Sequence, residues 1–385
     1  MAEKRPEHDN QQPQNATPAP APPPNGGIVA WLHTYYKLGA LFRHTSSNIL
    51  WIGFVQAFML LVVGFITGPI YDRGFLRPLL ILSSFGIVLL SQGFYISIKA
   101  RCLFVPYISI LLTYFSLRLG AAIRLATLGS SLGGIIYPII LKYLLEPLSF
   151  GWAVRVIGFR ALGTLLLLIV VMKQRVKPPK ARALIDATVF TDIPFMTLVL
   201  AGFLAFMGLF TIFFYILYVA SARQLTSPDM AFYIVPILNA ASCFGRTIPN
   251  TIANKLGPFN IIAPCCLMVG ILILCMMTVV NKASLIVIAV LVGFFSGALI
   301  GLPPLCFIAL TKDKSKIGTR IGMGFGMMAF GVLAGGPGSG DILGGAGELN
   351  WNGLWAFGGV STLVGSLILA GLRLTKFGFG LRVKA

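Results

Sequence analysis

The sequence predicts an all-α membrane protein with about ten to eleven transmembrane helices, and three observations support this prediction. Of the 385 residues, 57% are apolar and only 11% are charged, and the mean hydropathy is +0.87. Soluble chains carry about 25% charged residues, so this composition excludes an ordinary soluble enzyme. Uncharged runs recur at close to the roughly 20 residues that a helix needs to cross a bilayer. Lysine and arginine gather in particular connectors, as they do in cytoplasmic loops.

The net charge of +19 comes from 30 lysines and arginines against 11 acids. A soluble protein with this charge would suggest a nucleic-acid partner, but no basic stripe with interleaved aromatics is present, so none is expected. The six cysteines lie in apolar runs, and the three histidines all lie within the first 44 residues. No spacing suits a metal, so we expect no metal site, no cofactor and no disulfide scaffold.

Residues 1–25 are polar and rich in proline, which predicts a disordered cytosolic tail rather than a signal peptide. The segment Gly26–Asn48 mixes aromatic with charged residues and holds no run of spanning length. It is expected to lie on the membrane surface or to pack as a short helix against the bundle.

The first part of the chain holds five candidate spans. The run at 102–115 is broken by Pro106, and the last span begins with Arg155 and Arg160; the five are 49–70, 78–98, 102–115, 121–141 and 152–172. Five cations and no acid follow in ten residues, at Lys173, Arg175, Lys177, Lys180 and Arg182. The positive-inside rule makes this connector cytoplasmic. It divides an N-terminal bundle, 26–172, from the rest through a basic linker, 173–192.

The second part, 193–385, is predicted to be a six-helix bundle, with spans at 194–220, 230–252, 259–280, 284–310, 321–343 and 354–372. Its connectors alternate between cation-rich and cation-poor. The loop 312–320 and the C-terminal end are basic, whereas 345–352 carries no cation. This alternation places the linker, the loop 312–320 and the C-terminus in the cytoplasm.

One pattern occurs once in each part. It reads Gly68-Pro-Ile-Tyr-Asp72-Arg73-Gly74-Phe-Leu-Arg77 in the first and Gly245-Arg246-Thr-Ile-Pro249-Asn250-Thr-Ile-Ala-Asn254-Lys255-Leu-Gly257 in the second. Each is expected to join two spans by a tight turn. A carboxylate at a helix end can pair with arginines of the neighbouring loop and latch two helix ends in one conformation.

The repeated turn resembles the loop motif of the major facilitator superfamily, and the sequence around it is similar to fungal members of the monocarboxylate porter family. The stretches that carry this resemblance are Pro24–Trp31, Gly68–Arg77, Tyr114–Arg118, Gly129–Pro138, Phe150–Gly158 and Gly318–Gly324. The resemblance implies twelve helices in two halves, cytoplasmic termini, a place in the plasma membrane and alternating access. It also implies transport of a small organic anion, often in symport with a proton.

The chain departs from the family in its first half. After Trp31-Leu32 it continues at His33 with what resembles the stretch beyond the family's first transmembrane helix, and the resemblance therefore implies that this helix is missing. Near Leu89–Ser91 the end of the third helix and the start of the fourth are fused. Cations stand where small residues are expected, at Lys99, Arg101 and Arg124. A wrong gene model, a splice variant or a decaying paralogue would explain this, and functional cations are the alternative.

Four residues of the second part are predicted to bind substrate. The guanidinium of Arg246 suits a carboxylate because it donates two parallel hydrogen bonds, although it is also explained as an interface cation. Asn239, Tyr215 and Phe214 are expected to line a cavity, with packing as the alternative. The gating motif comprises Gly68, Asp72, Arg73 and Arg77, with Asn254 and Lys255 in the second copy.

The sequence thus predicts a secondary transporter of a small organic solute, surrounded by membrane lipid. No Asp, Glu or His lies in the middle of a clear span, which argues against proton coupling. No acid–base or nucleophile constellation is visible, so no enzyme activity is expected. The alternative is a membrane protein that does not transport: a degenerate carrier, a sensor or an assembly partner.

Overall fold

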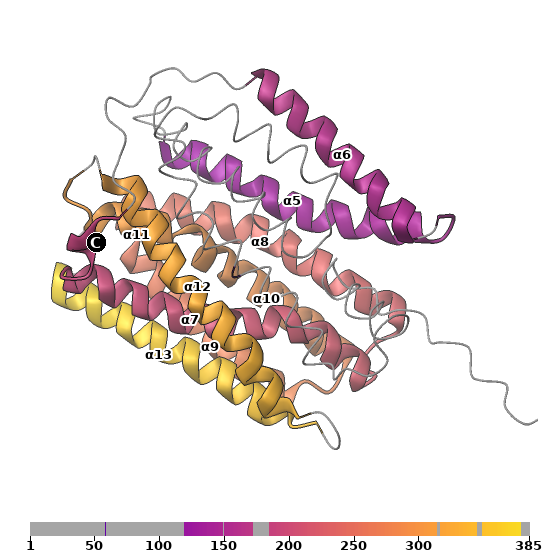
Figure 1. The fold of residues 1–385 in the computed structure, drawn as a ribbon. Helices are drawn as coiled ribbons and strands as arrows, with labels where there is room; N and C mark the ends of the chain where they lie inside the picture. Colours follow the sequence, from indigo (N-terminus) through magenta and orange to yellow (C-terminus); the bar gives the residue numbers. More distant parts are fainter. Residues whose placement is uncertain are drawn as a thin grey trace, which may run out of the picture.

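The computed structural model describes residue 58 and residues 119–148, 150–171, 185–313, 316–344 and 349–378. Every element in these ranges is a helix, as predicted, and the helices lie side by side in a bundle (Figure 1). The predicted tail, the segment 26–48, the basic connector 173–182 and nearly all of the spans at 49–70, 78–98 and 102–115 lie outside the described residues, as do the two predicted deletions.

The bounds of the elements follow the predicted spans to within about five residues. The helices are α5 (Leu119–Leu145), α6 (Phe150–Val171), η2 (Ala187–Val189), α7 (Ile193–Ala222), α8 (Pro228–Leu256), α9 (Phe259–Cys275), η3 (Met276–Thr278), α10 (Lys282–Gly301), α11 (Pro303–Leu310), α12 (Ile317–Leu343) and α13 (Trp351–Phe377). All eight predicted spans in the described ranges are therefore confirmed as helical.

Short polar residues and glycines set the helix ends. Asp192, Asn281 and Asn350 each accept a hydrogen bond from the backbone N–H three residues on, and so cap α7, α10 and α13. Gly257 ends α8 with φ 95°, a conformation that glycine adopts without steric cost. The predicted single span at 284–310 is two helices, α10 and α11, because Pro303 and Pro304 cannot donate the backbone hydrogen bonds that would continue α10.

Seven stretches of the described helices are long and apolar enough to cross a membrane. They are Leu128–Leu145, Ile193–Ala222, Met230–Ala253, Phe259–Thr278, Lys282–Leu310, Ile317–Leu343 and Trp351–Phe377. The hydropathy of these stretches and their length are what a bilayer requires of a spanning helix.

Helices α7 to α13 share one hydrophobic core, whose fully buried side chains include Phe195, Tyr215, Phe307 and Trp355. Within it, α7 packs on α12 and α13, α9 packs on α13, and α8 packs on α10. Helix α5 lies between α6 and α8 in Figure 1, and it contacts both. A separate small cluster around Leu141 and Ala153 joins α5 to α6.

Glycine brings α8 and α10 unusually close together. A Cβ atom built on Gly245 would lie 1.8 Å from the carbonyl oxygen of Phe294, and one on Gly293 would lie 2.3 Å from that of Leu238. Side chains this small at a crossing let two membrane helices approach to backbone contact. The crossing fixes which face of α8 meets α10 and which face is left for α5.

The tight turn expected of the second motif, Gly245–Gly257, is confirmed, and it lies at the end of the motif. Helix α8 continues through this stretch to Leu256, and only Gly257 and Pro258 separate it from α9. Side chains stabilise the helical backbone: Thr247 donates to the carbonyl of Cys243, and Asn250 donates to that of Arg246. Inside a bilayer, a helix that satisfies its own backbone groups is favoured over an open turn.

Candidate functional site

Polar and charged side chains lie along the contact between α5 and α8, which we call the α5–α8 seam. Near one end, the Nζ atom of Lys142 lies 5.1 Å from the ring centroids of both Phe232 and Tyr233. In the middle, Asn239 packs against Gly134. The contacts advance along α8 as they go back along α5, so the two helices cross in antiparallel directions. The seam joins a helix before the predicted linker to one after it.

Arg246 is held on this seam by hydroxyl groups from both helices. Its Nε donates to Ser242 Oγ at 3.3 Å, and its Nη1 donates to Ser130 Oγ of α5. The side chain is half-buried. Hydroxyls are neutral acceptors, so these two hydrogen bonds can be exchanged for stronger ones to an anion.

Arg246 lies deeper than expected. It stands ten residues before the end of α8 at Leu256, which is about 15 Å along the helix axis, whereas the predicted span 230–252 would place it about 9 Å from the end. It also lies inside the membrane-length stretch Met230–Ala253. The difference arises because α8 continues four residues beyond the predicted end of the span, to Leu256.

Asn239 shares the seam with Arg246. Its Nδ2 donates to the carbonyl of Val235 at 3.0 Å, and a Cβ atom on Gly134 would lie 2.6 Å from its Cγ. Asn239, Ser242 and Arg246 are spaced by three and four residues, which puts them on one face of α8. The structure therefore brings Asn239 and Arg246 together along the seam, as a shared site requires.

Tyr215 and Phe214 of α7 lie elsewhere. Tyr215 is 1% exposed and belongs to the core of α7–α13. Phe214 is half-buried and its ring packs against Phe210, with centroids 6.1 Å apart. Packing, the alternative interpretation from the sequence, describes both residues in this conformation.

The predicted gating motif falls mostly beyond the described residues. Gly68, Asp72, Arg73 and Arg77 lie outside them. Asn254 and Lys255 lie in the last turn of α8, and Lys255 is exposed.

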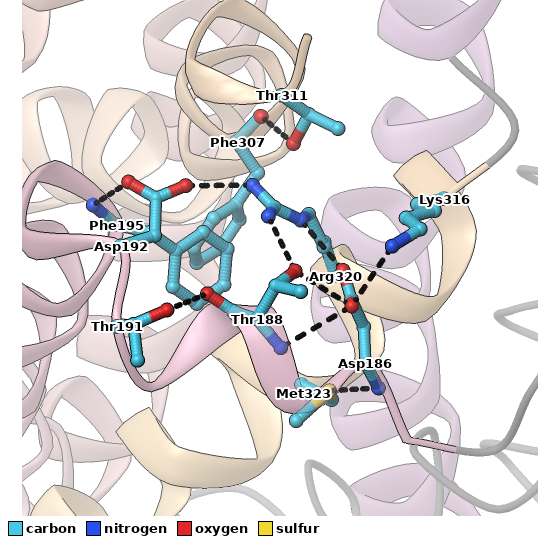
Figure 2. Close-up of polar contacts among 10 residues, drawn as sticks. All are labelled: Asp186, Thr188, Thr191, Asp192, Phe195, Phe307, Thr311, Lys316, Arg320 and Met323. Carbon is cyan, nitrogen blue, oxygen red and sulfur yellow. Dashed lines mark hydrogen bonds and ion pairs between the residues drawn. The ribbon is translucent and has the colours of Figure 1, made fainter. Parts of the chain in front are cut away.

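A second polar site, which we call the acid–arginine cluster, lies where α7 and α12 begin (Figure 2). Arg320 donates from Nε to Asp186 Oδ2 at 3.1 Å and from Nη1 to Asp192 Oδ2 at 2.8 Å. Its Nη2 donates to Thr188 Oγ1 at 3.2 Å. Lys316 adds a contact of 3.1 Å from Nζ to Asp186 Oδ1. Three polar side chains thus surround the guanidinium of Arg320, and together with Lys316 they tie the segment before α7 to the start of α12.

Asp186 is ionised in this cluster. The side chain is only 7% exposed, and burial alone would raise its pKa. Hydrogen bonds from Thr188, Lys316 and Arg320 outweigh burial and hold the pKa of Asp186 well below its usual range. The carboxylate therefore keeps its negative charge at any physiological pH.

Sequence reasoning missed this cluster. Lys316 and Arg320 were counted only as part of a cation-rich loop, and the two acids lie about 130 residues earlier in the chain. One local signal was available: Asp192 followed by Ile-Pro is typical of a helix start, and an acid there favours a nearby cation. Which cation it meets depends on tertiary packing.

No protein-family model matches the chain. It is 61% identical to the MFS-type transporter dbaD of Emericella nidulans, over 90% of this chain and 86% of the relative. It is 32% identical to the aspyridones efflux protein apdF of the same organism, over 85% of this chain and 74% of the relative. In three dimensions it resembles the human organic anion transporter MFSD10, with a TM-score of 0.67 at 15% identity, over 89% of this chain and 88% of that one. The structural likeness concerns the fold.

Proposed function

Because this chain belongs to the major facilitator superfamily and is a secondary transporter, we propose that its solute is a small organic anion such as a monocarboxylate. The predicted fold class, an all-α membrane protein of the major facilitator type, is confirmed, and the chain is an integral multi-pass membrane protein. Its placement in the monocarboxylate porter-like branch stays part of the proposal.

The observation that carries the proposed solute is the position of Arg246. A guanidinium inside a membrane-length stretch of α8 is energetically costly, so its presence there supports a functional role. It donates to the neutral hydroxyls of Ser242 and Ser130, and a carboxylate can replace these two contacts with charge-assisted hydrogen bonds. Asn239, which lies on the same face of α8, would donate to a second polar group of the same solute.

Transport is proposed to proceed by movement of two halves about the seam. We place the halves at 26–172 and 193–385, with the Pro-rich tail at 1–25 and the linker at 173–192. The seam supports this division because α5 and α8 come from different halves. When the halves rock, Arg246 and Ser130 would separate, and the solute would take the place of the hydroxyl. Asp72, Arg73 and Arg77 would latch the cytoplasmic side.

The direction of transport is proposed to be outward. Support comes from a relative that is named as an efflux protein. The positive-inside pattern supports cytoplasmic termini, and we propose the plasma membrane as the site of export. Phe214 and Tyr215 would reach the solute only after α7 has moved.

A proton is the proposed co-substrate, in line with the family resemblance. Asp341, an exposed acid near the end of α12, is the described carboxylate within a membrane-length stretch that such a role would use. If Asp341→Asn and a protonophore both leave solute accumulation unchanged, the proton drops out of the proposal.

We also propose that the first half of this chain is shorter than in its relatives. The alignment to the relative at 61% identity extends over 382 positions but covers 90% of 385 residues, or about 347, so about 35 positions have no residue of this chain. A gap of this size supports the loss of about one spanning helix with its connector. Sequencing of the transcript across codons 32–33 and 89–91 tests it.

Counterflow in proteoliposomes tests the proposed solute. Proteoliposomes that contain the purified chain are loaded with an unlabelled monocarboxylate, and the uptake of the labelled solute from outside is measured. The wild type, Arg246→Ala and Arg246→Lys are compared. Loss of a charge-assisted contact worth about 1.5–3 kcal/mol predicts a fall in flux of about 10- to 100-fold for Arg246→Ala. Arg246→Lys keeps the positive charge but loses the paired donors of the guanidinium, so its flux should fall less than that of Arg246→Ala.

Arg155→Ala on α6 is the matched control, because Arg155 is an exposed arginine whose guanidinium lies 5.1 Å from the ring of Trp152. It should leave flux unchanged. Equal flux for Arg246→Ala and wild type contradicts the proposed site. The absence of any flux from a folded protein favours the alternative, a degenerate carrier, sensor or assembly partner.

A further inference from the structure

We propose that a cavity at the start of α7 and α12 binds the phosphate group of an anionic phospholipid. The cavity has a volume of about 420 Å³ and opens at the end of the bundle that the cation pattern places in the cytoplasm. Four elements line it: the segment leading into α7, the end of α11, the start of α12 and the last turn of α13. The lining residues are Thr191, Asp192, Ile193, Pro194, Leu310, Lys312, Asp313, Lys316, Arg320 and Lys376.

The charged residues of the cavity fall into an inner and an outer set. Arg320 and Lys316 form the inner set, and they are balanced by the carboxylates of Asp186 and Asp192 (Figure 2). This set is neutral as a unit, and its network is complete without a ligand. The inner set therefore shapes the wall of the cavity rather than supplying its surplus charge.

The outer set carries the surplus. Lys312 follows α11 and Lys376 lies in the last turn of α13, and both side chains are exposed. Neither forms an ion pair with any residue that the structure describes. One acid, Asp313, accompanies them at the mouth. Two lysines from separate parts of the fold can approach one phosphate from two sides, and phosphate is a group that lysine binds well as a point charge.

The start of α12 adds to this attraction. No side chain caps its first turn, so the backbone N–H groups there carry uncompensated positive partial charge beside Lys316. By contrast, Asp192 caps the start of α7. The uncapped turn and the two lysines favour the same sign of ligand.

Exposed apolar side chains beside the cavity point to a lipid rather than a soluble anion. Ile193, which lines the cavity, is 78% exposed, and the nearby Phe190 and Ile185 are 59% and 56% exposed. Large apolar groups at the end of a membrane helix are expected to contact acyl chains. A basic pocket between helix ends at the cytoplasmic surface faces a leaflet that is rich in anionic lipid. A phospholipid offers both parts, whereas inorganic phosphate offers only the anion.

Binding to the full chain in detergent micelles tests the proposal, with phosphatidic acid, phosphatidylcholine and inorganic phosphate as separate probes. Phosphatidic acid should bind the wild type and phosphatidylcholine should not. Each lysine near a charged surface contributes about fivefold, so the double variant Lys312→Gln/Lys376→Gln should bind phosphatidic acid about thirtyfold more weakly. Both lysines lie outside the acid–arginine cluster, so the variant should elute as a folded monodisperse species.

Lys282→Gln is the matched control, because Lys282 is an exposed lysine at the start of α10, and the predicted topology puts it at the opposite membrane face. It should bind phosphatidic acid as the wild type does. Equal binding by the double variant and the wild type overturns the site. Inorganic phosphate that binds as tightly as the lipid, and competes with it, overturns the lipid as the source of the phosphate.

Discussion

At the scale of single residues, Arg320 is the side chain on which the start of α12 depends. It contacts Asp186, Asp192 and Thr188 with three different nitrogens. Its side chain is 11% exposed and that of Asp186 is 7% exposed, so little solvent can replace a lost partner. The three partners lie in the segment that leads into α7 and Arg320 lies in the first turn of α12, so the cluster stiffens the bundle formed by α7 to α13.

Arg320→Gln should therefore destabilise the protein strongly. Removal of one partner leaves the carboxylate of Asp186 buried with an incomplete set of donors, which costs about 3–5 kcal/mol. Lys316→Gln is the control: its side chain is 43% exposed, so its loss should cost at most about 1 kcal/mol. Thermal unfolding in detergent measures both, and equal effects of the two variants would contradict the assigned roles.

The same cluster predicts how stability responds to acid. The pKa of Asp186 in the folded protein is below its ordinary value of 3.8, so ionisation stabilises the fold at every pH above about 4. That contribution is lost only as the pH falls below 3.8 and through the lower folded pKa. Between pH 5 and 8, Asp186 is ionised in both the folded and the unfolded protein, so its contribution to the unfolding temperature should not change with pH.

Asp186→Asn provides the comparison for this pH dependence. The variant should be less stable than the wild type at neutral pH, and the difference should shrink in strong acid. A difference that instead grows as the pH is lowered from 5 to 3 would mean that Asp186 is not held ionised by its neighbours.

At the scale of elements, α8 is the helix that organises the candidate site. One face meets α10 through glycine, and a neighbouring face carries Asn239 and Arg246 to α5. Gly245 directly precedes Arg246, so the crossing with α10 sets where the guanidinium stands. A small shift of α8 would move Arg246 relative to Ser130.

Gly245→Ala should accordingly lower both stability and transport. Alanine usually stabilises a helix relative to glycine by about 0.5–1 kcal/mol, but here the new Cβ would lie 1.8 Å from the carbonyl oxygen of Phe294. Such overpacking costs about 1–3 kcal/mol. Gly371→Ala on α13, where a Cβ meets nothing within 4 Å, should be neutral or stabilising. Thermal unfolding measures both variants. Changes in unfolding temperature of the same sign and size would contradict the close packing of Gly245 against α10.

The sequence predicted the positions of the helices better than it predicted their contacts. Uncharged length alone located the helices of the described ranges, because lipid imposes that length on each span. The tight turn expected of the second motif is confined to Gly257 and Pro258, because the span before it continues as a helix to Leu256. Pro303 and Pro304 were visible as a break in 284–310 but were not used.

At the scale of the whole molecule, contacts between distant segments were beyond the sequence. Arg246 was identified as a candidate from its unusual place in an apolar run, but its partner Ser130 stands 116 residues away. Arg320 and its acids are separated further still, and nothing local selects among several cations. Both pairings arise from helix packing, which a single sequence does not specify.

Transport by this chain is proposed to require relative movement of α5 and α8. Lys142 and Tyr233 face each other across the seam, and neither belongs to the proposed binding residues. Lys142→Cys/Tyr233→Cys, joined by a short cleavable thiol cross-linker, would hold the seam in one state. The single variants, treated in the same way, control for the substitutions and the reagent.

Counterflow by the cross-linked double variant is the most direct measurement of this claim. Flux should be lost on cross-linking and should return when the cross-linker is cleaved. The single variants should keep their flux throughout. Full flux through a completely cross-linked protein would contradict movement at the seam.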